Sequence, residues 1–575
     1  MNRINTSSFA LFALAPALGG LLLASLTLAQ PDQAGGDWTP NRSAQTGNLP
    51  DGPIWGRGGS QPVAANQIFA TADGCATCHS ASPGASALWS NTGHDVSPHG
   101  MWQGTIKANA ARDPYWRAQL AAEIKDDPSR AKEFEALCMR CHTPMGHHTA
   151  EIAGLEPLSV DAAANHPLFG DGVSCTVCHQ IQPDNLGTKA TFDGQPVIKP
   201  GRVIFGPFHE PATGPMEMHA AYTPKQGLHI RSSAMCASCH TLETGHPGGA
   251  GTFPEQVPYY EWRNSVYSTE VESPGDWAMD CQTCHMPGVG SMRIARNPHG
   301  QDFNILKRSG VRAHTFVGAN AFMLDMLREN AEELGVTAPP EAFEQAARAT
   351  RALLARDTAT VHIGEPRREK TDQGETLVFD VTVTNLSGHK LPTAYPSRRV
   401  WIEALVRDGG TPIFDSGDFD IRGRLIGVED ELEIPHYDVI TSPDQVAVYE
   451  MTAKDTNGQT TTILTRMAER KKDNRLLPRG WSPTGPHADV TAPVGVNGDS
   501  DFVGGSDTVT YRVPLPEGTG DNCTIIVWLW LQTIPPAWVE HLRDVDAEET
   551  ERFIRMYDAA SPLPERLALS VRRER

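Results

Sequence analysis

Apolar and polar residues alternate along several stretches in the C-terminal half of the chain. Residues 375–385 and 399–408 carry an apolar side chain at every second position: Leu377, Phe379, Val381 and Val383 in the first, and Val400, Ile402, Ala404 and Val406 in the second. The segments DTVTYRV (507–513) and CTIIVWLWLQ (523–532) add strand-like runs, and the last is apolar enough for the centre of a sheet. Short strands joined by Gly, Pro and Asp turns predict an antiparallel β-sandwich. Cys523, in the most apolar run, is expected to be a buried free thiol.

Helical signals occur in three segments. Residues 340–356 (PEAFEQAARATRALLAR) predict a helix that leads into the strands. Asp113 as N-cap and Pro114 as the first helical residue predict a second helix. Residues 314–335 form an amphipathic stretch that we expect to end at Gly335.

The first 29 residues have the features of an export signal. An apolar run from Phe9 to Ala29 follows a short segment with one Arg and no acid, and Thr27 and Ala29 are small residues suited to a cleavage site. An uncleaved anchor is the alternative, because the run approaches the length of a membrane span. The loop-like segment 30–64 favours cleavage. We therefore expect a bacterial protein that is periplasmic or secreted.

The length and charge of the chain narrow the classes of function. Its 575 residues indicate two to four domains, and its 39% hydrophobic and 21% charged residues are typical of a soluble globular protein. The net charge of −20 argues against nucleic acid as a partner, since phosphates need a basic surface. Solubility alone explains the charge, and steering of a basic partner is the alternative.

Ten of the eleven cysteines form five C-x-x-C pairs, and a His follows each pair directly. This pattern is the attachment signature of c-type haem: the two thiols bind the two vinyl groups of one porphyrin, and the His binds iron. A zinc site would need two C-x-x-C pairs brought together, or later His ligands at a fixed spacing, and it does not require a His directly after each pair. The motifs therefore predict five covalently attached haems c. The thioether residues are Cys75 and Cys78, Cys138 and Cys141, Cys175 and Cys178, Cys236 and Cys239, and Cys281 and Cys284, and the proximal ligands are His79, His142, His179, His240 and His285.

Histidines outside the motifs are more numerous than a soluble domain usually contains, and five low-spin haems would use five of them as distal ligands. The candidates are His99, His147, His219, His229, His314 and His389. A surface or core role is the usual one for a lone His, and we assign it to His166, His209 and His246. His147 follows His142 too closely to reach the same haem, but it could reach a neighbouring one.

Several segments resemble the multihaem c-type cytochromes of the cytochrome c-552/4 family, which includes the tetrahaem acceptor of electrons from hydroxylamine oxidoreductase. They are GHDVSPHGMWQGTIKANAARDP, LCMRCHTPMG, DGVSCTVCH, LHIRSSAMCASCH and CQTCHMP, within residues 65–330. The resemblance implies closely stacked haems, mostly with two His ligands, and little regular structure beyond short helices. The chain departs from the family in its fifth motif and its long cysteine-poor C-terminal half.

The loop NLSGHKLPTAYPSRR (385–399), between two predicted strands, resembles a segment often appended to multihaem cytochromes. Our hypothesis is that His389 reaches the haem region as a distal ligand while Arg398 or Arg399 pairs with haem propionates. The alternative is that His389 only orders the loop. Separately, Asp499, Asp501 and Asp507 could hold Ca²⁺, although an ordinary acidic turn also explains them.

Together these features predict an α+β protein. We expect a signal peptide (1–29), a flexible linker (30–64), a mainly helical or irregular pentahaem domain (65–335), a linker helix (336–356) and an antiparallel β-sandwich domain (357–575). No catalytic residue is predicted.

The leading hypothesis for the function is electron transfer along packed haems between respiratory partners, with a cytochrome or a membrane quinol-oxidising complex as donor or acceptor. The alternative is an oxidoreductase that acts on nitrite, hydroxylamine or tetrathionate at one open haem. No C-x-x-C-Lys motif occurs, so the Lys-ligated haem of pentahaem nitrite reductases is missing. Docking of the β-domain to a membrane complex is compatible with the first hypothesis.

Overall fold

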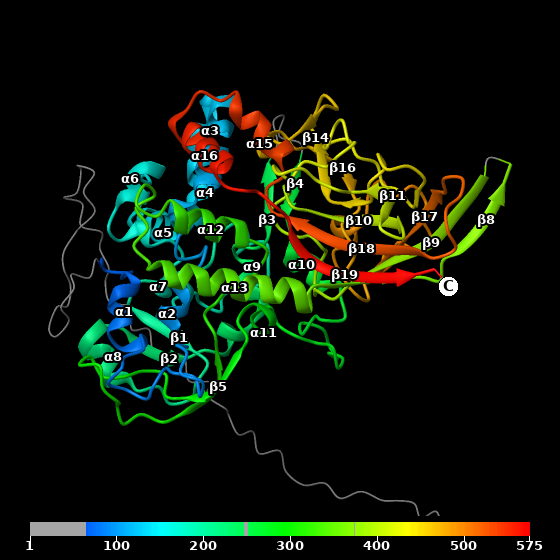
Figure 1. Ribbon diagram of the computed structural model, residues 1–575. Helices are drawn as coiled ribbons and strands as arrows, with labels where there is room; N and C mark the ends of the chain where they lie inside the picture. The colour runs from blue at the N-terminus through cyan, green and yellow to red at the C-terminus, as the bar shows by residue number, and fades with distance from the viewer. Residues whose placement is uncertain (1–64, 246–250, 373, 575) are drawn as a thin grey trace, which may run out of the picture. The chain divides into compact units, whose positions relative to one another are not determined.

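The computed structural model describes residues 65–245, 251–372 and 374–574, so the predicted signal peptide, the linker 30–64 and His246 lie outside the described residues. Its first half consists mainly of short helices (Figure 1): α1 (Ala72–His79), α2 (Pro98–Trp102), α3 (Pro114–Asp126), α4 (Ala131–His142), α5 (Pro144–Ala153), α6 (Val160–Asn165), α7 (Cys175–Cys178), α8 (Thr213–Ala220), α9 (Ser233–Ala237), α10 (Pro258–Arg263), α11 (Cys281–His285) and α12 (Ala321–Glu329). Three two-stranded ribbons connect them: β1 (Val203–Gly206) with β2 (Thr223–Gln226), β3 (Leu242–Gly245) with β4 (Thr252–Gln256), and β5 (Gly288–Met292) with β6 (Arg308–Arg312).

The C-terminal half contains two sheets. One has the strand order β11-β10-β18-β19 with β13 beside β10, and the other has the order β12-β17-β9-β7 with β8 beside β9. Neighbouring strands are antiparallel except β12 and β17. The strands are β7 (Ala359–Ile363), β8 (Arg367–Thr371), β9 (Gly374–Asn385), β10 (Arg399–Asp408), β11 (Thr411–Ser416), β12 (Val439–Ile440), β13 (Val448–Tyr449), β17 (Ser506–Pro514), β18 (Cys523–Gln532) and β19 (Glu565–Arg573). A smaller sheet joins β14 (Met451–Lys454), β15 (Thr460–Thr461) and β16 (Glu469–Asp473).

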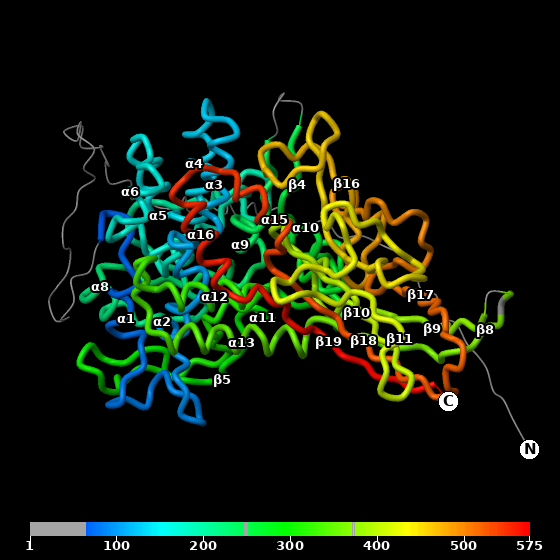
Figure 2. Tube along the Cα trace, turned by 45° about the horizontal axis from the view of Figure 1, so that its top comes forward, coloured from blue at the N-terminus to red at the C-terminus, as the bar shows by residue number. Residues whose placement is uncertain are grey.

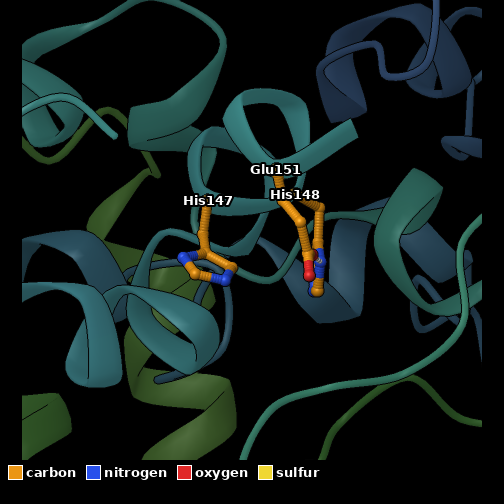
Figure 3. A group of neighbouring side chains, drawn as sticks. All are labelled: His147, His148 and Glu151. Carbon is orange, nitrogen blue, oxygen red and sulfur yellow. Dashed lines mark hydrogen bonds and ion pairs between the residues drawn. The ribbon is translucent and has the colours of Figure 1, made fainter. Parts of the chain in front are cut away.

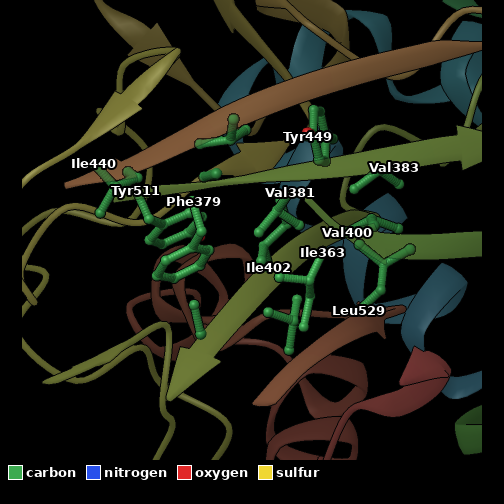
Figure 4. Packing of buried hydrophobic residues seen from close by; sticks show 14 of the residues in the cluster. Ile363, Phe379, Val381, Val383, Val400, Ile402, Ile440, Tyr449, Tyr511 and Leu529 are labelled. Carbon is green, nitrogen blue, oxygen red and sulfur yellow. The ribbon is translucent and has the colours of Figure 1, made fainter. Parts of the chain in front are cut away.

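One hydrophobic core lies between the two larger sheets (Figure 4). The apolar positions of the predicted alternation are buried in it from both sides, with Phe379 and Val381 on β9 and Ile402 on β10. Strand β18 lies between β10 and β19, the central position that its composition predicts, and Cys523 is buried and free. The structure thus confirms the α+β class and the sandwich.

Two helices between β18 and β19 lie outside the sandwich. Helices α15 (Pro536–Arg543) and α16 (Glu548–Ala559) pack against α3 of the first half, as Figures 1 and 2 show. Phe553 and Met556 of α16 meet Tyr115 and Ala118 of α3 in a shared core. A short helix, α14 (Ala488–Thr491), lies between β16 and β17. Among the described helices, none is both long and apolar enough to cross a membrane.

Two of the three predicted helices are confirmed. Helix α13 (Pro340–Asp357) matches the predicted segment, and the Asp113 carboxylate accepts the N–H groups of Tyr115 and Trp116 at the start of α3. The predicted end at Gly335 is wrong, because α12 stops at Glu329. The Asn330 side chain donates to the Met326 carbonyl at 2.9 Å, and such a bond competes with further helical hydrogen bonds.

Shortening a side chain in the sandwich core tests this packing. Ile402 is 0% exposed, so Ile402→Ala is expected to lower the free energy of unfolding by about 3 kcal/mol through lost burial and the cavity left behind. Ile421 is 85% exposed, and Ile421→Ala is expected to change the free energy of unfolding by less than about 0.5 kcal/mol. Urea unfolding measures both, and equal effects would contradict the assigned core.

Candidate functional site

Each C-x-x-C-H motif lies on or at the end of one helical turn. Motifs one, two, three and five lie on α1, at the end of α4, on α7 and on α11, and motif four begins in α9 and ends at His240 just beyond it. Residues three positions apart on a helix face the same side. The two thiols of each motif therefore project together, as attachment to one porphyrin edge requires.

Four of the five motif histidines are held in the same way. Nδ1 of His79, His142, His179 and His285 lies 2.5 to 3.1 Å from a backbone carbonyl, of Ile294, Ala110, Phe205 and Val317 respectively. A carbonyl only accepts, so Nδ1 carries the proton and Nε2 is left to bind a metal. Burial lowers the pKa of all four, to about 4 for His142 and His285. They are therefore neutral near pH 7, the form that ligates metals.

Two of the predicted distal histidines face a motif histidine. The rings of His179 and His314 have centres 6.4 Å apart and planes 14° apart, and those of His285 and His389 are 6.2 Å and 16° apart. Two imidazoles on opposite sides of one metal, each about 2 Å from it, have ring centres about 6 Å apart. Nδ1 of His314 and of His389 also donates to a backbone carbonyl, so Nε2 is free on both rings of each pair.

The loop that carries His389 is fixed by contacts with α10 and its flank. The Tyr267 hydroxyl donates to the Leu386 carbonyl at 2.9 Å, and a Cβ on Gly388 would lie 3.2 Å from the Trp262 ring. The Glu261 carboxylate accepts the backbone N–H of Lys390 at 3.1 Å. These contacts tie the loop between β9 and β10 to the half of the chain that contains the motifs.

A buried ion network anchors the residue next to His389. Lys390 Nζ lies 2.7 Å from Asp473, Arg475 lies 2.7 Å from Asp473, and Arg475 lies 3.1 Å from Glu261. Burial alone would raise the pKa of Asp473, but the charges of Arg475 and Lys390 outweigh it and hold this pKa well below its usual range. The network therefore joins α10, the His389 loop and the end of β16 through ionised side chains.

The two arginines at the end of the loop have different surroundings. Arg399 pairs with Glu431 at 3.2 Å and bonds to Gln532. Its charge is therefore balanced within the C-terminal half of the chain, residues 357–574, which we call the β-half. Arg398 donates to the Thr393 carbonyl and to Asn320, its Nε has no hydrogen-bond partner among the described residues, and burial lowers its pKa to about 10. A buried guanidinium without a carboxylate is unfavourable, and a haem propionate would supply the anion. Of the two predicted partners, Arg398 fits this role.

Two residues that the sequence analysis missed contact motif histidines. Lys107 Nζ lies 3.1 Å from Nε2 of His240, and the Trp116 ring stacks on His142 with centres 4.1 Å apart. Trp116 lies in the first turn of α3, whose N-cap is visible in the sequence, but nothing in the sequence indicates that this turn meets the second motif. Lys107 lies in a segment without regular structure. Its position in the sequence therefore does not indicate that it lies near a motif histidine.

The remaining predicted distal ligands face no motif histidine in the ring contacts of the described residues. His99 lies on α2, which packs beside α1 and the first motif. His229 bonds to the Ile181 carbonyl through Nε2, which leaves Nδ1 as its free nitrogen. His219 lies half-buried on α8. As distal ligands, these three residues remain predictions.

His147 and His148 lie side by side on α5, with Glu151 one turn further on (Figure 3). His148 Nδ1 contacts the Glu151 carboxylate at 3.1 Å, and the two rings have centres 5.3 Å apart. Burial lowers the pKa of His147 to about 4. His147 Nδ1 and His148 Nε2 are buried, and neither has a hydrogen-bond partner in the described part of the chain. His147 remains a predicted ligand of a neighbouring haem.

Thiols of different motifs lie close enough to raise or lower each other's pKa. The pairs are Cys75 with Cys175, Cys141 with Cys239, and Cys236 with Cys281. The first motif is therefore next to the third, and the fourth motif is next to both the second and the fifth. Groups attached to these sulfurs would lie next to one another.

The acidic residues proposed for Ca²⁺ lie near one another. His436 Nε2 contacts Asp499 at 3.0 Å, Asp507 is buried close to this pair, and Asp438 and Asp501 lie beside Asp499. Tyr449 donates to one oxygen of Asp507 at 2.7 Å. Ca²⁺ prefers oxygen ligands, and the imidazole of His436 departs from that preference. Calcium binding stays a prediction.

Comparison with known proteins gives one matching solved structure. It is described as a penta-heme cytochrome c552 from Thermochromatium tepidum, with 15% sequence identity, a TM-score of 0.48, and coverage of 88% of this chain and 98% of that one. No protein-family model matches the chain, and no curated protein matches it. What the motifs bind therefore has to follow from their own residues.

Removing one charge of the ion network tests its role. Lys390→Met leaves Asp473 with less positive charge in a buried position and is expected to lower the free energy of unfolding by about 3 kcal/mol. Lys454 forms an exposed pair with Glu469 at 3.1 Å, and Lys454→Met is expected to cost less than about 1 kcal/mol. Urea unfolding of both variants measures the difference, and similar values would show that the buried network contributes no more than a surface ion pair.

Proposed function

We propose that the chain is an exported pentahaem c-type cytochrome that transfers electrons between redox protein partners. The observation that carries the proposal is the presence of two pairs of facing histidines: His179 with His314, and His285 with His389. Each pair has the separation expected across one iron, and each ring keeps its Nε2 free. An iron with imidazole on both sides has no position for a substrate, so it exchanges electrons only.

The protein's part in this function is to hold ligands, distances and charges. The backbone carbonyls at Nδ1 fix the ring orientation and the tautomer of the motif histidines. Arg398 supplies a buried positive charge beside the fourth and fifth motifs, where it lowers the pKa of His240 and His285 together with larger effects of other groups and burial. Attached haem supplies the reversible one-electron chemistry.

The contacts between motifs support a continuous route for electrons. Thiols of motifs one and three, two and four, and four and five lie near each other, and Cys178 of motif three lies near Cys239 of motif four. The fourth motif is thus the junction of motifs two, three and five, and motif one reaches it through motif three. A junction suits a protein that collects electrons from one partner and passes them to another.

Haem counting and film voltammetry of the purified chain test the proposal. We expect five haems per chain by the pyridine haemochrome assay, and four in a Cys281→Ala/Cys284→Ala double variant. The voltammogram should show reversible waves that account for five electrons per chain.

Nitrite, hydroxylamine and tetrathionate should leave those waves unchanged. A catalytic current with any of the three would instead support the oxidoreductase alternative. A chain with no attached haem would overturn the proposed function.

A further inference from the structure

The fourth motif differs from the other four in the surroundings of its histidine. Nδ1 of the other four rings donates to a backbone carbonyl, and Nε2 is left free. In His240 it is Nε2, the nitrogen that would bind iron, that has a close neighbour: Lys107 Nζ at 3.1 Å. No histidine faces His240 in the ring contacts of the described residues.

The backbone and the side chain of Lys107 contact residues near the third motif and near its facing histidine. Its carbonyl accepts the N–H of Val173 at 2.9 Å, just before the third motif. Its ammonium lies over the Phe316 ring, 5.6 Å from the centre. Phe316 is two residues after His314, the residue that faces His179. Lys107 therefore lies between elements of the third and fourth motifs.

The polar groups near Lys107 are the imidazole of His240 and the thiol of Cys178, and carboxylates are missing from its surroundings among the described residues. No carboxylate lies within ion-pair distance of Lys107 in the described ranges. Lys107 also lies near His142 of the second motif and Cys178 of the third motif. A half-buried lysine whose Nζ lies beside an imidazole nitrogen is well placed to act as an amine ligand.

The geometry points to Lys107 as the distal ligand of the haem attached at Cys236 and Cys239, which gives this haem one imidazole and one amine ligand. This inference rests on the haem attachment proposed above. Two nitrogens on opposite sides of one iron lie about 4 Å apart. The observed 3.1 Å requires an outward movement of about 1 Å, which the four-carbon stem of a lysine allows.

The amine ligand has a consequence for the junction haem. An amine binds metal only in its neutral form, and a flexible lysine is easier to displace than an imidazole fixed through Nδ1. The fourth haem is therefore the one at which a small anion such as azide binds once the amine has left. Haems with two fixed histidines do not bind it.

The test is low-temperature EPR and near-infrared magnetic circular dichroism of the oxidised holoprotein. In the wild-type chain, we expect one haem in five to show the charge-transfer band of His and amine ligation, at a different energy from that of two histidines. In Lys107→Ala, one haem in five should become high-spin and bind azide. Lys107→His should restore a low-spin haem, and Lys125→Ala, at an exposed lysine of α3, should match the wild type.

The outcomes separate this inference from the proposed function. Five haems with no His–amine band in the wild type would overturn the lysine ligand and leave the proposed function standing. If Lys107→Ala keeps five haems with unchanged spin states, the lysine ligand is also overturned and the proposed function stands. Lys107 would then contribute only its charge to this region. If Lys107→Ala fails to incorporate five haems, the wild-type spectrum tests the inference: a His–amine charge-transfer band supports the lysine ligand, and the absence of this band overturns it. A wild-type chain without haem would overturn both.

Discussion

The buried network of Lys390, Asp473, Arg475 and Glu261 is the constraint on which the rest of the structure depends. Taking ions out of water is unfavourable, and only close opposite charges and further hydrogen bonds compensate. All four side chains are therefore held within a narrow geometry, with contacts of 2.7 to 3.1 Å. Because Glu261 lies on α10 and Asp473 ends β16, this geometry also fixes the β-half against the half that contains the motifs.

The network determines where a metal ligand can lie. Lys390 follows His389 directly, so anchoring the lysine sets the position of the imidazole, and the bond from Nδ1 to the Lys390 carbonyl sets its orientation. The ring then faces His285 of the fifth motif at 6.2 Å. Arg398, nine residues further along, brings a buried positive charge to the same region. The β-half therefore supplies a histidine that faces a motif histidine of the first half, and it would complete the haem environment that we propose.

The sequence predicted the features that come from a repeated pattern. It did not predict contacts between segments that are far apart in the chain. Period-two alternation gave the strands and their buried faces, because burial of Val381 and Ile402 follows from the pleat itself. The motifs predicted the proximal histidines, because covalent attachment needs fixed spacing. Lys107, and the docking of α15 and α16 on α3, depend on which surfaces meet. No local spacing encodes this, and a lone lysine looks like any solvated charge. The loop sequence identified His389 as a candidate, but only the structure placed it opposite His285.

The most direct test of this account is the spin state of the haems in oxidised His389→Ala, measured by low-temperature EPR beside the wild type. Removing the imidazole opens one iron if His389 is its ligand. The account therefore predicts that one haem in five changes from low-spin to high-spin, with five haems still attached. His299→Ala, at an exposed histidine, should give the wild-type spectrum. If every haem of His389→Ala keeps its wild-type spin state, His389 only orders its loop, and the β-half supplies no ligand at this position.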